Sequence, residues 1–81
     1  HYFITRSHVK MSDVGGKQMG AFLIKKGDYL QELALTHSKG AEYEKARDLY
    51  MQAASYYKKA GAKDKMKEAM LKAKAEQEKM G

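Results

Sequence analysis

Histidine, serine and carboxylate side chains are the groups of this chain that could carry out chemistry, and their spacing decides which chemistry is open to them. A metal site on a helix needs two ligands on one face, such as histidines four residues apart, and His1, His8 and His37 form no such pair. The segment Gly15-Gly16-Lys17 lacks the upstream glycine and the following Ser or Thr of a phosphate-binding loop. The serines have no motif of a nucleophile beside a base. The sequence therefore predicts a protein that is not an enzyme and binds neither a metal nor a cofactor.

The composition describes a small basic domain. The chain has 81 residues, no proline, no cysteine and a net charge of +6, which allows one domain of marginal stability. The excess charge is divided equally between the two halves of the chain, so a dedicated phosphate-binding stripe, and with it nucleic-acid binding, is not expected. No apolar run approaches the roughly 20 residues of a transmembrane helix. Because the absence of cysteine is compatible with a reducing compartment, we expect an intracellular, cytoplasmic protein.

The first half of the chain predicts a lead-in followed by a helix. Residues 1–16 are expected to be a flexible N-terminal lead-in, because residues 12–16 are turn-like, while residues 2–4 form a short strand or pack against a neighbour. Residues 17–39 carry apolar side chains at helical spacing, interrupted by Gly27. A single helix bears Gly27 at a cost of about 1 kcal/mol; alternatively, a second helix begins with Asp28 as its N-cap. The single helix is favoured, because a break of one residue leaves no room for a turn.

Two further helices are predicted. Residues 42–60 have acids early, lysines late, and Gly61 in the position of a left-handed C-terminal cap. Residues 63–80 have a narrow apolar stripe and a broad charged face, as in a terminal capping helix, with Asp64 as N-cap. We therefore expect an all-α fold, an antiparallel helical hairpin plus a third capping helix, formed by residues 17–81 alone or as a fragment of a longer helical array. The predicted core stripes are Ala46, Leu49, Tyr50, Ala53, Ala54 and Tyr57, followed by Met66, Ala69, Met70, Ala73 and Gln77.

The hairpin carries the residue pattern of a known repeat. Its first helix has a large residue, a leucine and a small residue at the required spacing, and its second helix has alanine, an aromatic residue and alanine. The turn of this repeat, Gly-Asp-Tyr, corresponds to residues 41–43, Ala-Glu-Tyr, with the glycine one position earlier at Gly40. The segment from Gly27 to about residue 60 therefore resembles a tetratricopeptide (TPR) repeat, which implies a helical hairpin that binds other proteins. The matching helix positions are Leu30, Leu33, Ala34, Ala46, Tyr50 and Ala53.

The same residues are similar to a second family, the microtubule-interacting and trafficking (MIT) domain. That domain is a three-helix bundle of about this length, with an Ala-Gly-Asn-Tyr turn followed by Ala, Tyr and Ala. Residues 40–43, together with Ala46, Tyr50 and Ala53, match this pattern nearly as well. The resemblance implies a groove beside the third helix that binds helical tails of membrane-remodelling proteins. The choice between the two families stays open at this point.

Tyrosines and methionines are the side chains most suited to contact a partner. Tyr43, Tyr50 and Tyr57 are expected to pack between helices with their hydroxyls at the rim, which leaves Tyr56 as the outward-facing ring. Met66 and Met70 are expected to fill the core or a junction with a neighbouring repeat; alternatively, they form an adaptable face for a partner helix. The predicted partner-binding residues are Arg47, Tyr56, Lys58 and Lys59.

The sequence thus predicts a non-catalytic module for protein–protein interaction, an adaptor or scaffold that binds a partner helix or an extended peptide. One alternative is an MIT-type trafficking domain that binds tails of membrane-remodelling proteins. A second alternative is a basic binder of nucleic acid or of an anionic membrane, whose affinity would fall steeply with salt.

Overall fold

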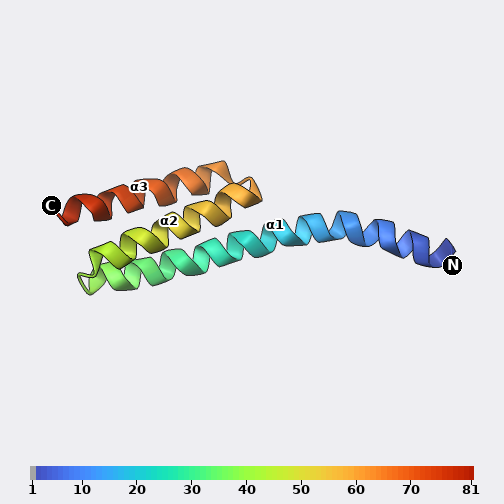
Figure 1. Ribbon diagram of the computed structural model, residues 1–81, viewed down its shortest axis with the longest axis horizontal. Coiled ribbons are helices and arrows are strands. Elements are labelled where there is room, and N and C mark those ends of the chain that lie inside the picture. Colours follow the sequence, from blue (N-terminus) through green and yellow to red (C-terminus); the bar gives the residue numbers. More distant parts are fainter. Residues whose placement is uncertain (1) are drawn as a thin grey trace.

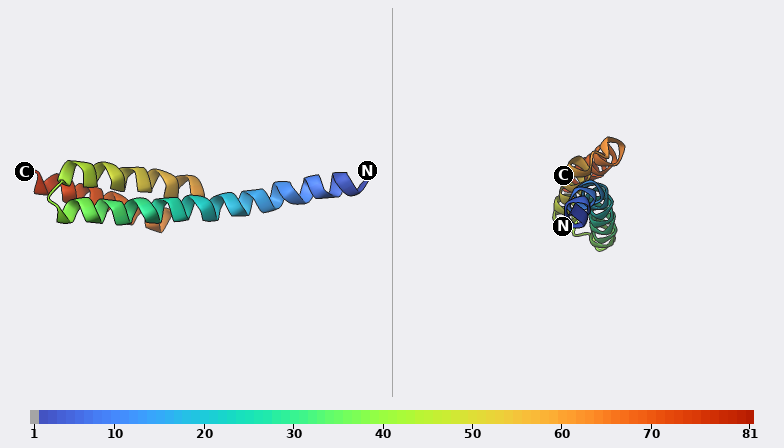
Figure 2. Two further views of the ribbon diagram at one scale, coloured as in Figure 1. Left: turned by 90° about the horizontal axis from the view of Figure 1, so that it is seen from below. Right: turned by 90° about the vertical axis from the view of Figure 1, so that its right-hand side faces the viewer.

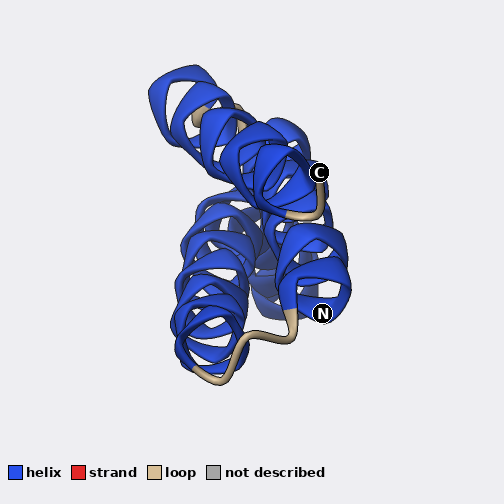
Figure 3. Cartoon of the chain, turned by 90° about the vertical axis from the view of Figure 1, so that its left-hand side faces the viewer, coloured by secondary structure: helices blue, strands red, loops and turns tan. Residues whose placement is uncertain are grey.

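A computed structural model of the chain describes the backbone of residues 2–81 and the side chains of residues 19–81. Residues 2–81 form three helices and no strand: α1 (Tyr2–Lys39), α2 (Tyr43–Ala60) and α3 (Lys63–Lys79). α1 packs against α2, and α2 packs against α3, with successive helices antiparallel (Figure 1). Viewed end-on, α3 is stacked on the hairpin of α1 and α2 (Figure 3). The predicted all-α fold, a hairpin plus a third helix, is confirmed.

Helix α1 begins earlier than predicted. It starts at Tyr2 rather than at residue 17, so the expected lead-in lies within the bounds of the helix. The turn at residues 12–16 and the short strand at residues 2–4 are therefore wrong, because two glycines lower helix propensity without removing a backbone donor, as proline would. The N-terminal part of α1 extends beyond the ends of α2 and α3 (Figure 2). The flexibility of residues 1–16 stays a prediction.

The helix runs through Gly27 without a break, which confirms the single-helix prediction and makes the Asp28 N-cap wrong. A Cβ atom at Gly27 would lie 2.7 Å from Cε1 of Tyr57, closer than van der Waals contact. Gly27 is buried, and its missing side chain makes room for the Tyr57 ring. Gly27 therefore allows α1 and α2 to pack closely, and it does not end a helix.

The core follows the predicted alternation of tyrosine and alanine. Tyr57 is completely buried and Tyr50 is 4% exposed, and each lies in a cluster with alanines from more than one helix. Leu49, predicted in the stripe of α2, is only partly buried against both clusters. Small side chains let the helix backbones approach closely enough for each ring to be enclosed. The buried apolar residues are Leu30, Ala34, Ala46, Tyr50, Ala53, Ala54, Tyr57, Ala69 and Ala73.

Both turns close with a residue in the left-handed conformation. Gly61 has φ 77°, as predicted, and the amide of Ala62 donates to the Tyr57 carbonyl at 2.9 Å, which caps α2. After α1 the left-handed residue is Ala41, with φ 63°, and the amide of Glu42 donates to the His37 carbonyl at 2.8 Å. The chain therefore holds an alanine at position 41 in the conformation that favours glycine.

Helix α3 is rotated relative to the predicted stripe. Its buried residues are Ala69, Ala73 and Glu76, whereas Met70 is 46% exposed and Gln77 is exposed. The N-cap is Ala62, so Asp64 lies in the first turn and the prediction that it caps the helix is wrong. The two alanines set this rotation, because only small side chains fit against the tyrosine-filled surface of α2.

Candidate functional site

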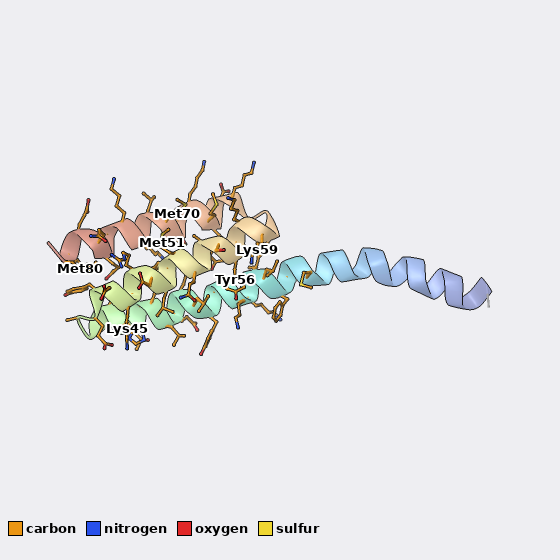
Figure 4. The ribbon with its side chains drawn as sticks, viewed as in Figure 1. Lys45, Met51, Tyr56, Lys59, Met70 and Met80 are labelled. Carbon is orange, nitrogen blue, oxygen red and sulfur yellow. The ribbon has the colours of Figure 1, made fainter. Side chains whose placement is uncertain are left out.

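The four predicted contact residues lie on two different sides of α2. Arg47 donates to Gln77 of α3 and forms an ion pair with Asp48 at 3.0 Å. Lys58 also lies on the side of α3, where it borders a surface groove. Tyr56 and Lys59 lie on the side of α1 (Figure 4), with the ammonium 5.7 Å from the ring centre.

The structure therefore does not bring Arg47, Tyr56, Lys58 and Lys59 into one patch. Positions 47 and 58 differ by eleven residues, which places them on nearly the same side of a helix but about 16 Å apart along it. Tyr56 is half-buried, and Tyr57 is the fully buried ring of the pair. This confirms that Tyr56 is the more accessible of the two tyrosines.

A largely apolar groove lies between α2 and α3. It has a volume of about 420 Å³ and is lined by Met51, Ala54, Ser55, Lys58, Met66 and Met70. We call it the methionine groove. Met51 is 48% exposed and Met70 is 46% exposed, and the two lie next to each other where α2 and α3 adjoin (Figure 4). Met66 is half-buried and packs against the core, as expected. Met70 does not fill the core, and its place at a junction with a neighbouring repeat stays a prediction.

The charged side chains near the methionine groove are mainly lysines. Lys67 and Lys74 stand three residues before and four residues after Met70, so they share its side of α3. With Lys58 they are exposed, and none has a carboxylate partner among the described side chains. The acids nearest to these two lysines of α3 by helical position are Asp64, three residues before Lys67, and Glu78, four residues after Lys74, and neither forms an ion pair with them. On α2, Asp48 is paired with Arg47. The groove is therefore apolar inside and basic along its border.

A second groove, between α1 and α3, differs in character. It has a volume of about 600 Å³ and is crossed by side-chain contacts. Lys65 of α3 forms an ion pair with Asp28 of α1 at 3.2 Å, and Lys72 donates to Gln31 at 3.0 Å. Because these polar groups are satisfied within the chain, a ligand there would have to break existing contacts.

A polar cluster at the bottom of this second groove fixes the buried tyrosine. The Tyr57 hydroxyl donates to the Asp28 carboxylate, and the Gln31 amide donates to the hydroxyl oxygen at 2.8 Å. Burial, and next the bond to Asp28, raises the pKa of Tyr57 to about 12. The same bond, opposed in part by desolvation and assisted by Lys65, lowers the pKa of Asp28. Asp28 therefore anchors the ring that fills the space above Gly27.

Glu76 is the buried charge that the sequence did not reveal. The residue is 5% exposed, and its carboxylate accepts from the Ser38 hydroxyl at 2.8 Å and from Lys79 at 3.1 Å. It follows Ala69 and Ala73 at helical spacing, which was a signal, but a glutamate is normally assigned to the solvent side. Met51 was missed for a related reason, since it falls outside the core stripe of α2.

At the end of α1, His37 contributes to the turn. Its Nδ1 lies 2.6 Å from the Glu42 carboxylate, and this hydrogen bond is the main cause that lowers the pKa of Glu42.

Among the residues whose side chains are described, no three His, Asp or Glu residues gather as a metal site would require. Over the same residues, no helix is long and apolar enough to cross a membrane. Comparisons of the chain with family models, curated proteins and solved structures give no match.

Proposed function

We propose that this chain is a non-catalytic protein-interaction module that binds a segment of a partner protein. The observation that carries the proposal is the methionine groove, in which two large apolar side chains, Met51 and Met70, stay half-exposed beside each other. Unbranched, polarisable methionine side chains adapt to differently shaped ligands. Exposed apolar surface enclosed by charged residues is typical of sites that recognise a helix or a peptide.

The alternative within the same class is a trafficking domain of the MIT type. Its support is the position of the groove, which lies between the second and third helices, beside α3. The TPR-like interpretation instead makes this face the contact for a further helical repeat. Both interpretations use the same groove and differ in the partner.

A selection of peptides from a random library tests the proposal. We expect the full chain to enrich peptides that bind it, and the double variant Met51→Lys/Met70→Lys to lose their binding. Leu71→Lys is the matched control, because Leu71 is also on α3 and 69% exposed but does not line the groove. Its binding should equal that of the unmodified chain.

Methyl NMR of the methionines gives the site directly. The enriched peptides should shift the methyl signals of Met51, Met66 and Met70 and leave the signal of Met19, on α1, in place. Failure to enrich any peptide, or enriched peptides that bind the double variant equally well, would contradict the proposal.

A further inference from the structure

The methionine groove has the dimensions of a helix-binding site. On α2, the lining residues run from Met51 to Lys58 at intervals of three and four residues, and on α3 they are Met66 and Met70, four residues apart. Seven residues of helix span about 10 Å, or two turns. The bottom of the groove is Ala54, a small residue 5% exposed, with methionines on both sides. A helix with three apolar side chains over two turns would lay those side chains between the methionines.

The border of the groove specifies the charge of such a helix. Lys58 contributes from α2, and Lys67 and Lys74 from α3, each without a carboxylate partner among the described side chains. By contrast Lys65, Lys72 and Lys79, on the side of α3 toward α1, are paired with Asp28, Glu68 and Glu76. Three unpaired lysines thus border the open face of the groove, where a ligand's carboxylates would neutralise them.

From this arrangement we infer that the methionine groove binds an amphipathic helix whose apolar stripe is flanked by Asp and Glu. The inference rests on the proposed function and names its partner by chemistry. The apolar stripe supplies affinity by covering Met51, Met66 and Met70. The flanking carboxylates supply selectivity, because a helix flanked by Lys or Arg would place like charges together at Lys58 and Lys67.

Two synthetic helical peptides of about 16 residues, titrated against the full chain by isothermal calorimetry, test the inference. Both carry Leu at i, i+4 and i+7, one with Glu and the other with Lys at the flanking positions. We expect the Glu peptide to bind at least about ten-fold more tightly than the Lys peptide at low salt, and this ratio to shrink when the ionic strength is raised.

Substitutions that remove the charge of chosen lysines show which side chains cause the preference for the Glu peptide. Lys58→Gln/Lys67→Gln should weaken binding of the Glu peptide about five- to ten-fold and leave the Lys peptide unaffected or slightly improved. Lys25→Gln/Lys45→Gln, two exposed lysines that do not line the groove, is the matched control and should change neither affinity.

The possible failures are separable. Equal affinity for the two peptides, or loss of binding in the control variant as well, would overturn the inference while leaving the interaction function intact. Binding of neither peptide would overturn it too, and the random-library selection would then decide whether the proposed function also fails. Binding to vesicles of anionic phospholipid, with no binding of the Glu peptide, would replace the helical partner by a membrane surface.

Discussion

At the scale of the residue, the contact of Gly27 with Tyr57 decides how α1 meets α2. A Cβ atom at position 27 would lie 2.7 Å from Cε1 and 2.8 Å from Cζ of the buried ring. We expect Gly27→Ala to lower the free energy of unfolding by about 1–2 kcal/mol, because the cost of overpacking outweighs the better helix propensity of alanine. Urea denaturation followed by circular dichroism measures the change.

Gly20 provides the control on the same helix. A Cβ atom there would meet nothing within 4 Å, so Gly20→Ala should raise the free energy of unfolding by up to about 1 kcal/mol. Two glycines of one helix are therefore expected to respond with opposite signs. If both substitutions stabilise the chain, the close approach of Tyr57 is not a constraint.

The buried Tyr57 hydroxyl predicts a loss of stability at high pH. Its pKa of about 12 in the folded chain lies above the ordinary value of 10.0, so the folded state holds the proton more tightly. The contribution is fully present below pH 10 and is lost as the pH rises from 10 to 12, by at most about 1.4 kcal/mol per pH unit. The free energy of unfolding, measured over this range for the unmodified chain and for Tyr57→Phe, gives the effect.

The difference between the two free energies should therefore shrink as the pH rises toward 12. A difference that stays constant from pH 9 to 12 would show that the hydroxyl is not held in its neutral form.

At the scale of the element, the turn between α1 and α2 contains a residue that can be improved. Ala41 has φ 63° and is exposed, a conformation that costs an L-residue roughly 1–2 kcal/mol. We expect Ala41→Gly to raise the free energy of unfolding by about 0.5 kcal/mol, after the greater entropy of glycine in the unfolded chain is subtracted. Gly40→Ala is the comparison, because Gly40 has no positive φ and a Cβ would meet only ordinary contacts.

The hydrogen bond that Glu76 accepts from Ser38 links α3 to the end of α1. Glu76→Ala would remove a buried carboxylate that accepts two hydrogen bonds and leave the Ser38 hydroxyl without this acceptor, so we expect a loss of about 1–3 kcal/mol of unfolding free energy. Glu78→Ala, two residues later and exposed, should change it by less than about 0.5 kcal/mol. Equal effects of the two substitutions in thermal denaturation would rule out a fastening role for Glu76.

The sequence predicted the buried side of a helix correctly where the spacing of its core residues was clear. On α2 the helical spacing of the core residues identifies the buried side directly, because the large rings can be enclosed only on the side that also carries the alanines. These residues are Ala46, Tyr50, Ala53 and Tyr57. On α3 the pattern is weaker. Methionine is apolar and flexible, so Met66 and Met70 look like core residues, yet the alanines fix the rotation and place Met70 outside.

The candidate site could not be derived from spacing along one helix. The methionine groove combines Met51 from α2 with Met66 and Met70 from α3, and only the relative rotation of two packed helices brings them together. The four contact residues predicted on α2 lie on two sides of that helix, which their spacing already indicates, because Tyr56 and Lys58 are only two residues apart.

At the scale of the whole molecule, the length of α1 dominates the shape. The radius of gyration is 17.0 Å and the longest dimension is 62 Å, whereas a compact domain of this length has a radius of gyration of about 12 Å. The excess arises because α1 has 38 residues and α2 has 18, so the first half of α1 extends past its neighbour (Figure 1).

This geometry predicts that the amides in the two halves of α1 are protected from hydrogen exchange to different degrees. Around Leu30 and Ala34, the amides of α1 belong to the packed core and should exchange their hydrogens only by global unfolding. The N-terminal part of α1 extends beyond α2 (Figure 1), and a protruding helical segment is marginal in water, the more so with glycines at 15 and 16. Residue-resolved hydrogen exchange should therefore find fast exchange before residue 17 and slow exchange around Leu30. Uniform protection that disappears on dilution would mean instead that the extension is stabilised by a second copy of the chain, and uniform protection at every concentration would show that the extended helix is stable by itself.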